Sequence, residues 1–302
     1  MRVLNFGSLN IDYVYHVEHI LSPGETLSSK QMEVFPGGKG MNQSIALARA
    51  GVEVYHAGMI GEDDGQFLLD TCSENRVNTH LIRTVKGKSG HAVIQVDETA
   101  RNSILLYGGG NRRITKEYVD EVLGYFDEGD LLVLQNEVNM VDYIIDAAYE
   151  KGMRIILNPS PFDKELERCD FSKVSLFLVN EIEGRLLAGT GYETEEDGEK
   201  LIEGIMKKYK EAGVALTMGE KGAFFAGGDQ WYYQKCFPVD AVDTTAAGDT
   251  FTGYFVAGPL KGGRMETIME MAAKAAAIAV SRKGAAPSIP RMEEVMLFGD
   301  SK

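Results

Sequence analysis

Short apolar runs alternate with longer amphipathic stretches along most of the chain. Each run is rich in Val, Ile and Leu, which is typical of a strand buried on both faces. The runs are residues 3–6, 54–60, 131–134, 154–157, 176–179 and 214–217. The stretches between them have helical spacing, and several end at glycine. These predicted helices are residues 42–50, 66–74, 141–151, 181–188 and 196–211. The alternation predicts an α/β fold with a mainly parallel sheet flanked by helices on both faces.

Two segments break this rhythm, residues 11–35 and 90–107. The second contains HAVIQVDETARNSILLY, in which two β-rich runs flank a polar turn. We interpret both segments as a small β-sheet lid over a ligand cleft, and residues 1–10, 36–89 and 108–302 as the α/β core. The alternative is an ordinary antiparallel extension at an edge of the main sheet.

The C-terminal part is predicted to be helical over residues 251–256 and 265–282. Small and apolar side chains share one face of the second helix, which allows close packing on the sheet. They are Ile268, Met271, Ala272, Ala275 and Ala279.

Charge and cysteine content exclude several classes of protein. The 302 residues include 31 Lys and Arg against 45 Asp and Glu, a formal net charge of -14 that disfavours nucleic acid and anionic membranes as partners. No apolar run is long enough for a spanning helix. The cysteines Cys72, Cys169 and Cys236 are widely spaced and predict neither a disulfide framework nor a zinc site. We therefore expect a cytoplasmic protein.

The segment DTTAAGDTFTG, residues 243–253, places small residues before an apolar-periodic helix. Free N–H groups of Ala247, Gly248 and Asp249 at the helix start would form an anion hole suited to a phosphoryl group. Asp249 would lie beside that group and could accept the proton of an attacking hydroxyl. A helix start makes a carboxylate a weak base, but a loose phosphoryl-transfer transition state needs little basicity. The alternative is that Asp249 or Thr250 only caps the helix.

A second glycine-rich turn, PGGKGMNQ at residues 36–43, also runs into a helix. Its glycines allow close approach of a ligand, Lys39 supplies a positive charge, and the Asn42 amide can bind hydroxyls. The alternative is a flexible turn with a solvated lysine.

The sequence lacks two common nucleotide-binding motifs, the P-loop and the dinucleotide-binding G-x-G-x-x-G. Gly87-Lys88-Ser89 ends like a P-loop, but Ile82 stands where the leading glycine should be. No G-x-G-x-x-G follows the first strand, which argues against a dinucleotide enzyme.

Together the two segments resemble the signatures of the ribokinase family of carbohydrate kinases, also called the PfkB family, over essentially the whole chain. The resemblance implies ATP-dependent phosphorylation of a sugar, with Asp249 as catalytic base and the amides of Ala246, Ala247 and Gly248 as the anion hole. It implies that the sugar is bound by Asn10, Asp12, Gly38, Lys39, Asn42, Glu137 and Asp249. On polar character alone, Asn10 and Asp12 could instead cap a turn, and Glu137 could be solvated.

The same resemblance implies the remaining ligands. ATP would be bound by Asn180, Glu183, Thr217, Gly219, Gly222 and Gly248, with Mg²⁺ and its waters organised by Glu183. A monovalent-cation site for K⁺ would comprise Asp243, Thr245, Ala279, Arg282, Gly284 and Ser288, mostly through carbonyl oxygens.

The leading hypothesis is a kinase that converts D-ribose to D-ribose 5-phosphate. Deoxyribose, fructose or adenosine are alternative acceptors, and a non-catalytic sugar-binding regulator or a scaffolding protein are alternatives of other classes. Exposed strand edges in the lid predict a homodimer formed through it.

Overall fold

The computed structural model describes residues 1–99, 101–191 and 197–299. Within these ranges nine strands form one large sheet in the order β13-β12-β11-β10-β9-β8-β1-β4-β5. Its parallel strands are β1 (Val3–Phe6), β4 (Val54–Gly61), β5 (Ile82–Val85), β8 (Leu131–Gln135), β9 (Arg154–Asn158), β10 (Leu176–Asn180) and β11 (Gly213–Thr217). All strands predicted from the apolar runs are present, so the mainly parallel sheet is confirmed. An antiparallel edge of β12 (Ala223–Gly227) and β13 (Gln230–Gln234) was not predicted.

The helices follow the predicted alternation closely. They are α1 (Lys39–Arg49), α2 (Gln66–Glu74), α3 (Lys116–Leu123), α4 (Val141–Glu150), α5 (Glu181–Ala188), α6 (Gly198–Lys208), α7 (Ala247–Leu260), α8 (Met265–Val280) and α9 (Met292–Leu297). The predicted start of the 196–211 helix, Glu196, lies outside the described residues. Helices α3 and α9 were not predicted. In the described ranges, no helix has the length and apolar character needed to cross a membrane.

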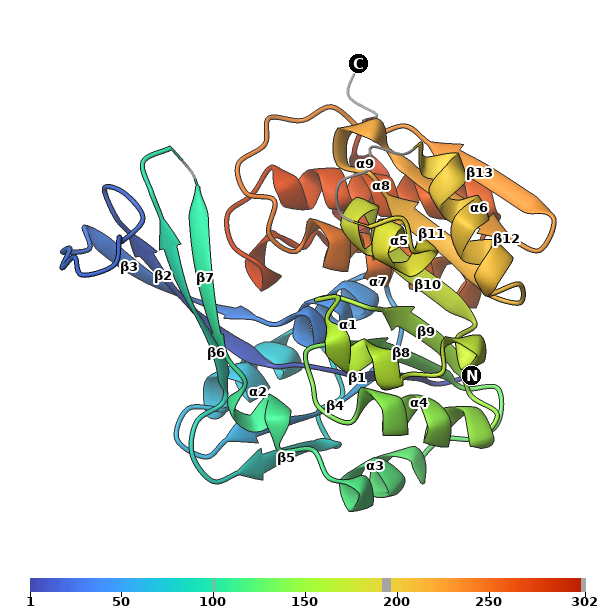
Figure 1. Ribbon diagram of the computed structural model, residues 1–302, viewed down its shortest axis with the longest axis horizontal. Helices are drawn as coiled ribbons and strands as arrows, with labels where there is room; N and C mark the ends of the chain where they lie inside the picture. The colour runs from blue at the N-terminus through green and yellow to red at the C-terminus, as the bar shows by residue number, and fades with distance from the viewer. Residues whose placement is uncertain (100, 192–196, 300–302) are drawn as a thin grey trace.

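Helices cover both faces of the large sheet because its strands bury alternate residues on opposite sides. Val3 and Val133 pack into a cluster with α1, α7 and α8, whereas Leu4 and Leu132 pack into a second cluster with α3, α4, α5 and α6. Figure 1 shows these two helical layers on either side of the strands. Successive residues of a strand point to opposite faces of the sheet. A sheet covered by helices on both faces therefore needs strands that are apolar throughout.

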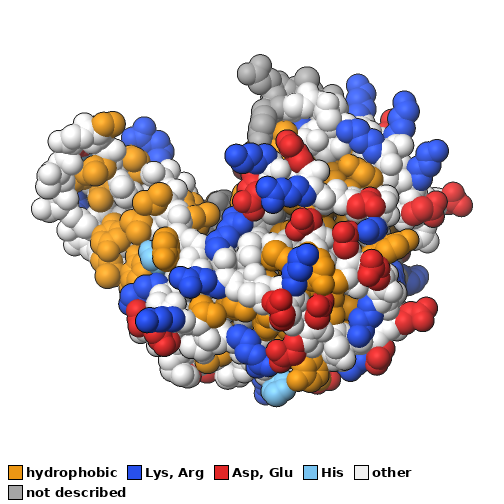
Figure 2. Space-filling view, turned by 60° about the horizontal axis from the view of Figure 1, so that its bottom comes forward, with side chains coloured by type: hydrophobic (Ala, Val, Ile, Leu, Met, Phe, Trp, Pro, Cys, Tyr) orange, Lys and Arg blue, Asp and Glu red, His pale blue; other side chains and the backbone are white. Residues whose placement is uncertain are grey.

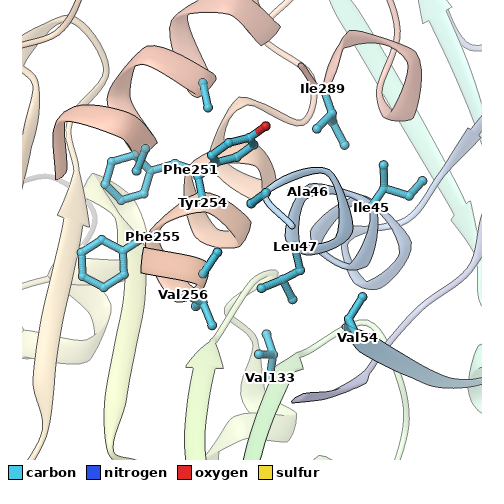
Figure 3. Packing of buried hydrophobic residues seen from close by; sticks show 14 of the residues in the cluster. Ile45, Ala46, Leu47, Val54, Val133, Phe251, Tyr254, Phe255, Val256 and Ile289 are labelled. Atoms are coloured by element: carbon cyan, nitrogen blue, oxygen red, sulfur yellow. The ribbon is translucent and has the colours of Figure 1, made fainter. Parts of the chain in front are cut away.

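Helices α1 and α7 pack against each other on the first face. Figure 3 shows Ala46 and Leu47 of α1 close to Tyr254 and Val256 of α7, above the strands of the sheet. Their approach depends on Gly253, because a Cβ there would lie 2.3 Å from the Cβ of Ala46. The N-terminal turns of the two helices are thereby brought together at one end of the sheet.

The two segments that interrupt the alternation form a separate four-stranded sheet in the order β3-β2-β6-β7. Its strands are β2 (Asn10–His16), β3 (Gln31–Gly37), β6 (Gly90–Val96) and β7 (Asn102–Tyr107). The central β2 and β6 are parallel, and β3 and β7 flank them antiparallel. This sheet projects from one side of the molecule (Figure 1). An extension of the main sheet's edge is therefore wrong.

The projecting sheet exposes much apolar surface. Every residue of the edge strand β7 is exposed, with Leu105 at 71% and Ile104, Leu106 and Tyr107 each above half. Figure 2 shows hydrophobic side chains gathered over this sheet. A contiguous patch of this kind is typical of an interaction site.

Candidate active site

The strand order reverses between β1 and β8, since the chain proceeds from β1 to β4 on one side and later returns to β8 on the other. Open α/β sheets bind ligands in the crevice at the carboxyl ends of strands beside such a reversal. Ser8 and Asn10 follow β1 at this point, and Glu137 follows β8. The sheet topology alone therefore places these polar side chains at one crevice.

Glu137 is bonded to the chain around it. Its Oε2 accepts hydrogen bonds from the Ser8 hydroxyl and, at 2.9 Å, from the backbone N–H of Lys39. The solvated reading of Glu137 is therefore wrong. The turn before Lys39 needs a glycine, because Gly38 has φ +91° and a Cβ there would lie 3.0 Å from the backbone nitrogen of Asn10.

Asn10 and Asp12 start β2 and are both buried. The Oδ1 of Asn10 accepts from Asn111 Nδ2 at 2.7 Å. Burial, and then the nearby charge of Glu137, raises the pKa of Asp12 to about 7. Gly37 is essential to this packing, since a Cβ there would lie 2.0 Å from the Asp12 carboxylate. Both side chains belong to a packed polar wall.

Asp249 lies in the first turn of α7 with 6% of its surface exposed. It does not cap the helix. The N-cap is Ala246, whose left-handed φ of 60° is costly for a non-glycine residue and typical of functional sites, and no side chain caps the turn. The Asp249 carboxylate instead accepts from Asn42 Nδ2 at 3.1 Å and from Gln43 Nε2 at 2.9 Å.

The helix start beside Asp249 is open. A Cβ at Gly248 would meet no atom within 4 Å. The backbone N–H of Ala247 makes only a long contact of 3.3 Å with the carbonyl of Thr244. Uncapped N–H groups and the helix dipole make this surface suitable for an anion.

Lys39 brings a positive charge to the same place. Burial disfavours its charge, but the carboxylates of Asp249, Glu137 and Glu183 outweigh burial and raise the pKa of Lys39. The side chain therefore remains protonated between the two halves of the crevice. A freely solvated lysine is the wrong reading.

The other half of the crevice is a pocket reaching from Asp249 to the ends of β10 and β11. It is lined by Lys39, Asn158, Leu178, Val179, Asn180, Glu183, Ala215, Thr217, Gly248, Asp249, Phe251 and Thr252. Asn180 and Glu183 form a reciprocal capping box at the start of α5. Gly219, which begins the short helix after β11, and Gly222, which follows it, are both at positive φ. A Cβ at Gly222 would collide with the carbonyl of Gln234, so that glycine has a packing role of its own.

Glu183 is the predicted contact for Mg²⁺ and its waters. The carboxylate already accepts from the backbone and side chain of Asn180, each at 3.0 Å. Asn158 Nδ2 makes a longer contact of 3.5 Å. A carboxylate has about four acceptor sites, so these bonds leave room for a metal-bound water. Over the described ranges, no three or more His, Cys, Asp or Glu side chains group as a metal site.

Of the residues predicted for K⁺, Thr245 and Gly284 hydrogen-bond to a third, Asp243. Its carboxylate accepts from the backbone N–H of Thr245 at 2.9 Å and of Gly284 at 3.0 Å, and its own N–H donates to the carbonyl of Val280. Ala279 and Arg282 lie at the end of α8, and the buried Ser288 donates to Ala285. The K⁺ site itself stays a prediction.

Several site residues escaped the sequence analysis. Ser8 holds Glu137, Asn111 holds Asn10, and Gln43 and Asn158 share a hydrogen bond of 3.2 Å beside Asp249. Ser8 lies two residues after the predicted strand 3–6, and Asn158 directly follows the predicted strand 154–157, so their position was a usable signal. Gln43 and Asn111 carry no such signal.

Comparisons with known proteins show the family of this chain. The model of the pfkB family carbohydrate kinases matches residues 2–292. The chain is 33% identical to a ribokinase of Haemophilus influenzae over 97% of this chain and 96% of that protein. It is 31% identical to a deoxyribokinase of Salmonella typhi over 97% of each. It also resembles the structure of Arabidopsis thaliana ribokinase complexed with ribose and ATP, with a TM-score of 0.82, 28% identity and coverage of 98% and 97%. The chain therefore belongs to the pfkB family of carbohydrate kinases, and it is a sugar kinase.

Proposed function

We propose that this sugar kinase transfers the γ-phosphoryl group of ATP to D-ribose and forms D-ribose 5-phosphate. The observation that carries the proposal is the buried carboxylate of Asp249 beside the uncapped start of α7. The similarity to a ribokinase of Haemophilus influenzae and to a ribokinase complexed with ribose and ATP supports ribose as the acceptor.

Sugar hydroxyls would be bound by the polar wall at the ends of β1 and β8. Asn10, Asp12 and Glu137 offer acceptors, Lys39 offers a cation, and Gly38 lets the ring approach the backbone. The Oδ1 of Asn42 is buried without a hydrogen-bond partner among the described residues. A buried acceptor of this kind is costly unless a ligand donates to it.

Transfer would proceed in line between the sugar hydroxyl and ATP. Asp249 orients the hydroxyl and accepts its proton as the bond to phosphorus forms and the bond from phosphorus to the ADP oxygen breaks. The N–H groups of Ala246, Ala247 and Gly248 stabilise negative charge on the transferring group.

ATP would occupy the pocket between α5, the end of β11 and α7, against Asn180, Glu183, Thr217, Gly219, Gly222 and Gly248. Mg²⁺, when bound, would neutralise phosphate charge, with Glu183 holding its waters. K⁺ at Asp243, Thr245, Ala279, Arg282, Gly284 and Ser288 would fix the loop that leads into the anion hole.

The projecting sheet would act as a lid that excludes water from the phosphoryl donor. Its exposed edge strand β7 is also the surface we propose for a homodimer. The 71% exposure of Leu105 supports that contact.

Deoxyribose is the second candidate acceptor, because a Salmonella typhi deoxyribokinase is 31% identical to this chain. The two sugars differ by the 2-hydroxyl, and a site built to bind that hydroxyl rejects its absence strongly.

A substrate panel tests the proposal. ADP release would be measured with ribose, deoxyribose, fructose and adenosine at matched concentrations. We expect the highest kcat/KM with ribose. No turnover of ribose beside turnover of another acceptor would overturn the assignment.

A further inference from the structure

The side chain of Gln43 hydrogen-bonds to Asp249 but is fully buried. Gln43 follows Asn42 on α1, and each donates to a different oxygen of the Asp249 carboxylate. Neighbours on a helix point about 100° apart. Both reach Asp249 because α1 and α7 are close, as Gly253 allows. Asn42 keeps an acceptor that no described residue satisfies, whereas both polar atoms of the fully buried Gln43 are in use.

The amide of Gln43 is locked in one orientation. Its Oε1 accepts from Gln135 Nε2 at 2.7 Å, and the same Gln135 nitrogen donates to Asn5 Oδ1 at 3.0 Å. Because Gln135 presents a donor, Gln43 must turn its carbonyl to Gln135 and its NH₂ group to Asp249. Gln43, Gln135 and Asn5 are all fully buried, so water cannot replace these contacts.

The line of hydrogen bonds continues into the core without adding charge. Asn5 Nδ2 donates to the carbonyl of Gly40 and the hydroxyl of Ser44, and that hydroxyl is 2.8 Å from His56 Nδ1. Burial lowers the pKa of His56 to about 4. The imidazole is therefore neutral near pH 7, and the line ends in the interior as a rigid anchor.

We propose that Gln43 is the positioning residue of the catalytic base: it fixes the Asp249 carboxylate through Oδ1 and is itself fixed by Gln135 and Asn5. The inference rests on the proposed role of Asp249. Gln43 is fully buried and does not line the pocket beside Asp249, so its contribution is to the orientation of the base. A carboxylate held at both oxygens stays aligned with the attacking hydroxyl, and small misplacements of reacting groups are costly in rate.

Gln43→Met tests this, because it removes the donor while keeping length and adding no charge. We expect kcat to fall about 10- to 100-fold. KM for ribose and ATP should change less than about threefold, since no substrate contact is lost. The acidic limb of the kcat profile should move to higher pH, because a carboxylate that loses a donor holds its proton more tightly.

Gln43→Glu sharpens the test by placing a second carboxylate against Asp249, which should shift the acidic limb further. Gln66→Glu is the matched control, because Gln66 also donates to an aspartate, Asp70, but on exposed α2. Its kcat and pH profile should stay those of the parent. All variants are assayed at a temperature where circular dichroism shows full folding.

The double variant Gln43→Met with Asp249→Asn separates this inference from the proposed function. If Gln43 acts through Asp249, adding Gln43→Met to Asp249→Asn lowers kcat no further. An active Asp249→Asn variant would overturn the proposed base itself. An inactive Asp249→Asn beside a folded Gln43→Met with parental kcat and pH profile would overturn only the positioning role, as would a rise in KM at unchanged kcat.

Discussion

The floor of the crevice and the projecting sheet are built in opposite ways. Around Asp249 the polar side chains are buried and bonded to one another, so Asn42, Gln43 and Asp249 hold their positions without a ligand. In β7 every side chain is exposed, and Leu105 has no cover from the core. The crevice around Asp249 is held by internal hydrogen bonds and leaves the Asn42 Oδ1 without a partner among the described residues, whereas the projecting sheet leaves apolar surface exposed.

The two constructions suit different roles. Groups that orient reacting atoms are most effective when they are fixed before substrate arrives. The lid and dimer surface that we propose for the projecting sheet would need exchangeable contacts, so such a sheet would not be packed in the same way. Each variant below changes one region, and measurements of stability, activity or self-association show whether the effect is confined to that region.

Asp12, at the junction of the two regions, should give the largest effect. Burial, and then the charge of Glu137, raise its pKa from the ordinary value of 3.8 to about 7 in the folded chain. The folded state therefore holds a proton that the unfolded state loses, so the stabilisation is full below about pH 4 and is lost as pH rises through about 7. Between these values the free energy of unfolding should fall by up to about 4 kcal/mol. Denaturant unfolding across pH measures it, and Asp12→Asn should flatten the curve; an equal slope in both proteins would contradict the assignment.

Gly253→Ala should break the contact of α1 with α7. The new Cβ would lie 2.3 Å from the Cβ of Ala46 and 2.8 Å from the backbone nitrogen of Leu47. We expect a loss of about 2 kcal/mol in the free energy of unfolding, with lower kcat because Asn42 and Gln43 move away from Asp249. Urea unfolding and steady-state assays test this. Parental stability and activity together would refute the close-packing argument.

Gly248→Ala, on the same helix, should lower kcat without lowering stability. The methyl group meets no protein atom within 4 Å, so the melting temperature should hold or rise slightly. If phosphoryl oxygens rest on this turn, the methyl group intrudes on them, and kcat should fall about tenfold, equivalent to about 1.4 kcal/mol. Thermal melting and kinetics on one preparation decide it. Unchanged kcat would argue against an anion at Gly248.

Leu105→Ser should have the smallest effect on the folded monomer. A side chain exposed at 71% contributes little to folding, and the free energy of unfolding should change by less than about 0.5 kcal/mol at low protein concentration. Sedimentation should nevertheless show weaker self-association. A large destabilisation of the monomer would mean that β7 packs on the core.

The sequence predicted the scaffold well because apolar runs and helix patterns are local. It missed the β12–β13 edge, although Gly227-Gly228-Asp229 between aromatic runs was a usable turn signal. Position at a helix start singled out Asp249 and Lys39 as candidates, whereas Glu137 came only from the resemblance to the family. Lys39 and Asp249 line one pocket, and Glu137 accepts from the backbone N–H of Lys39.

The sequence could not show how the site is supported. Gln43 looks like any helical polar residue, and its partner Gln135 is 92 positions away. The sequence also does not indicate that β2 pairs in parallel with β6, because the local pattern of each segment predicts a strand but not its partner. Such contacts depend on tertiary structure alone.

The most direct test of the central claim is the rate of ribose phosphorylation by Asp249→Asn. The substitution keeps the size of the side chain but removes the proton acceptor. We predict a fall in kcat of about 10³-fold, with ribose binding retained in calorimetric titration and unfolding close to that of the parent. A kcat within about tenfold of the parent would contradict Asp249 as the catalytic base.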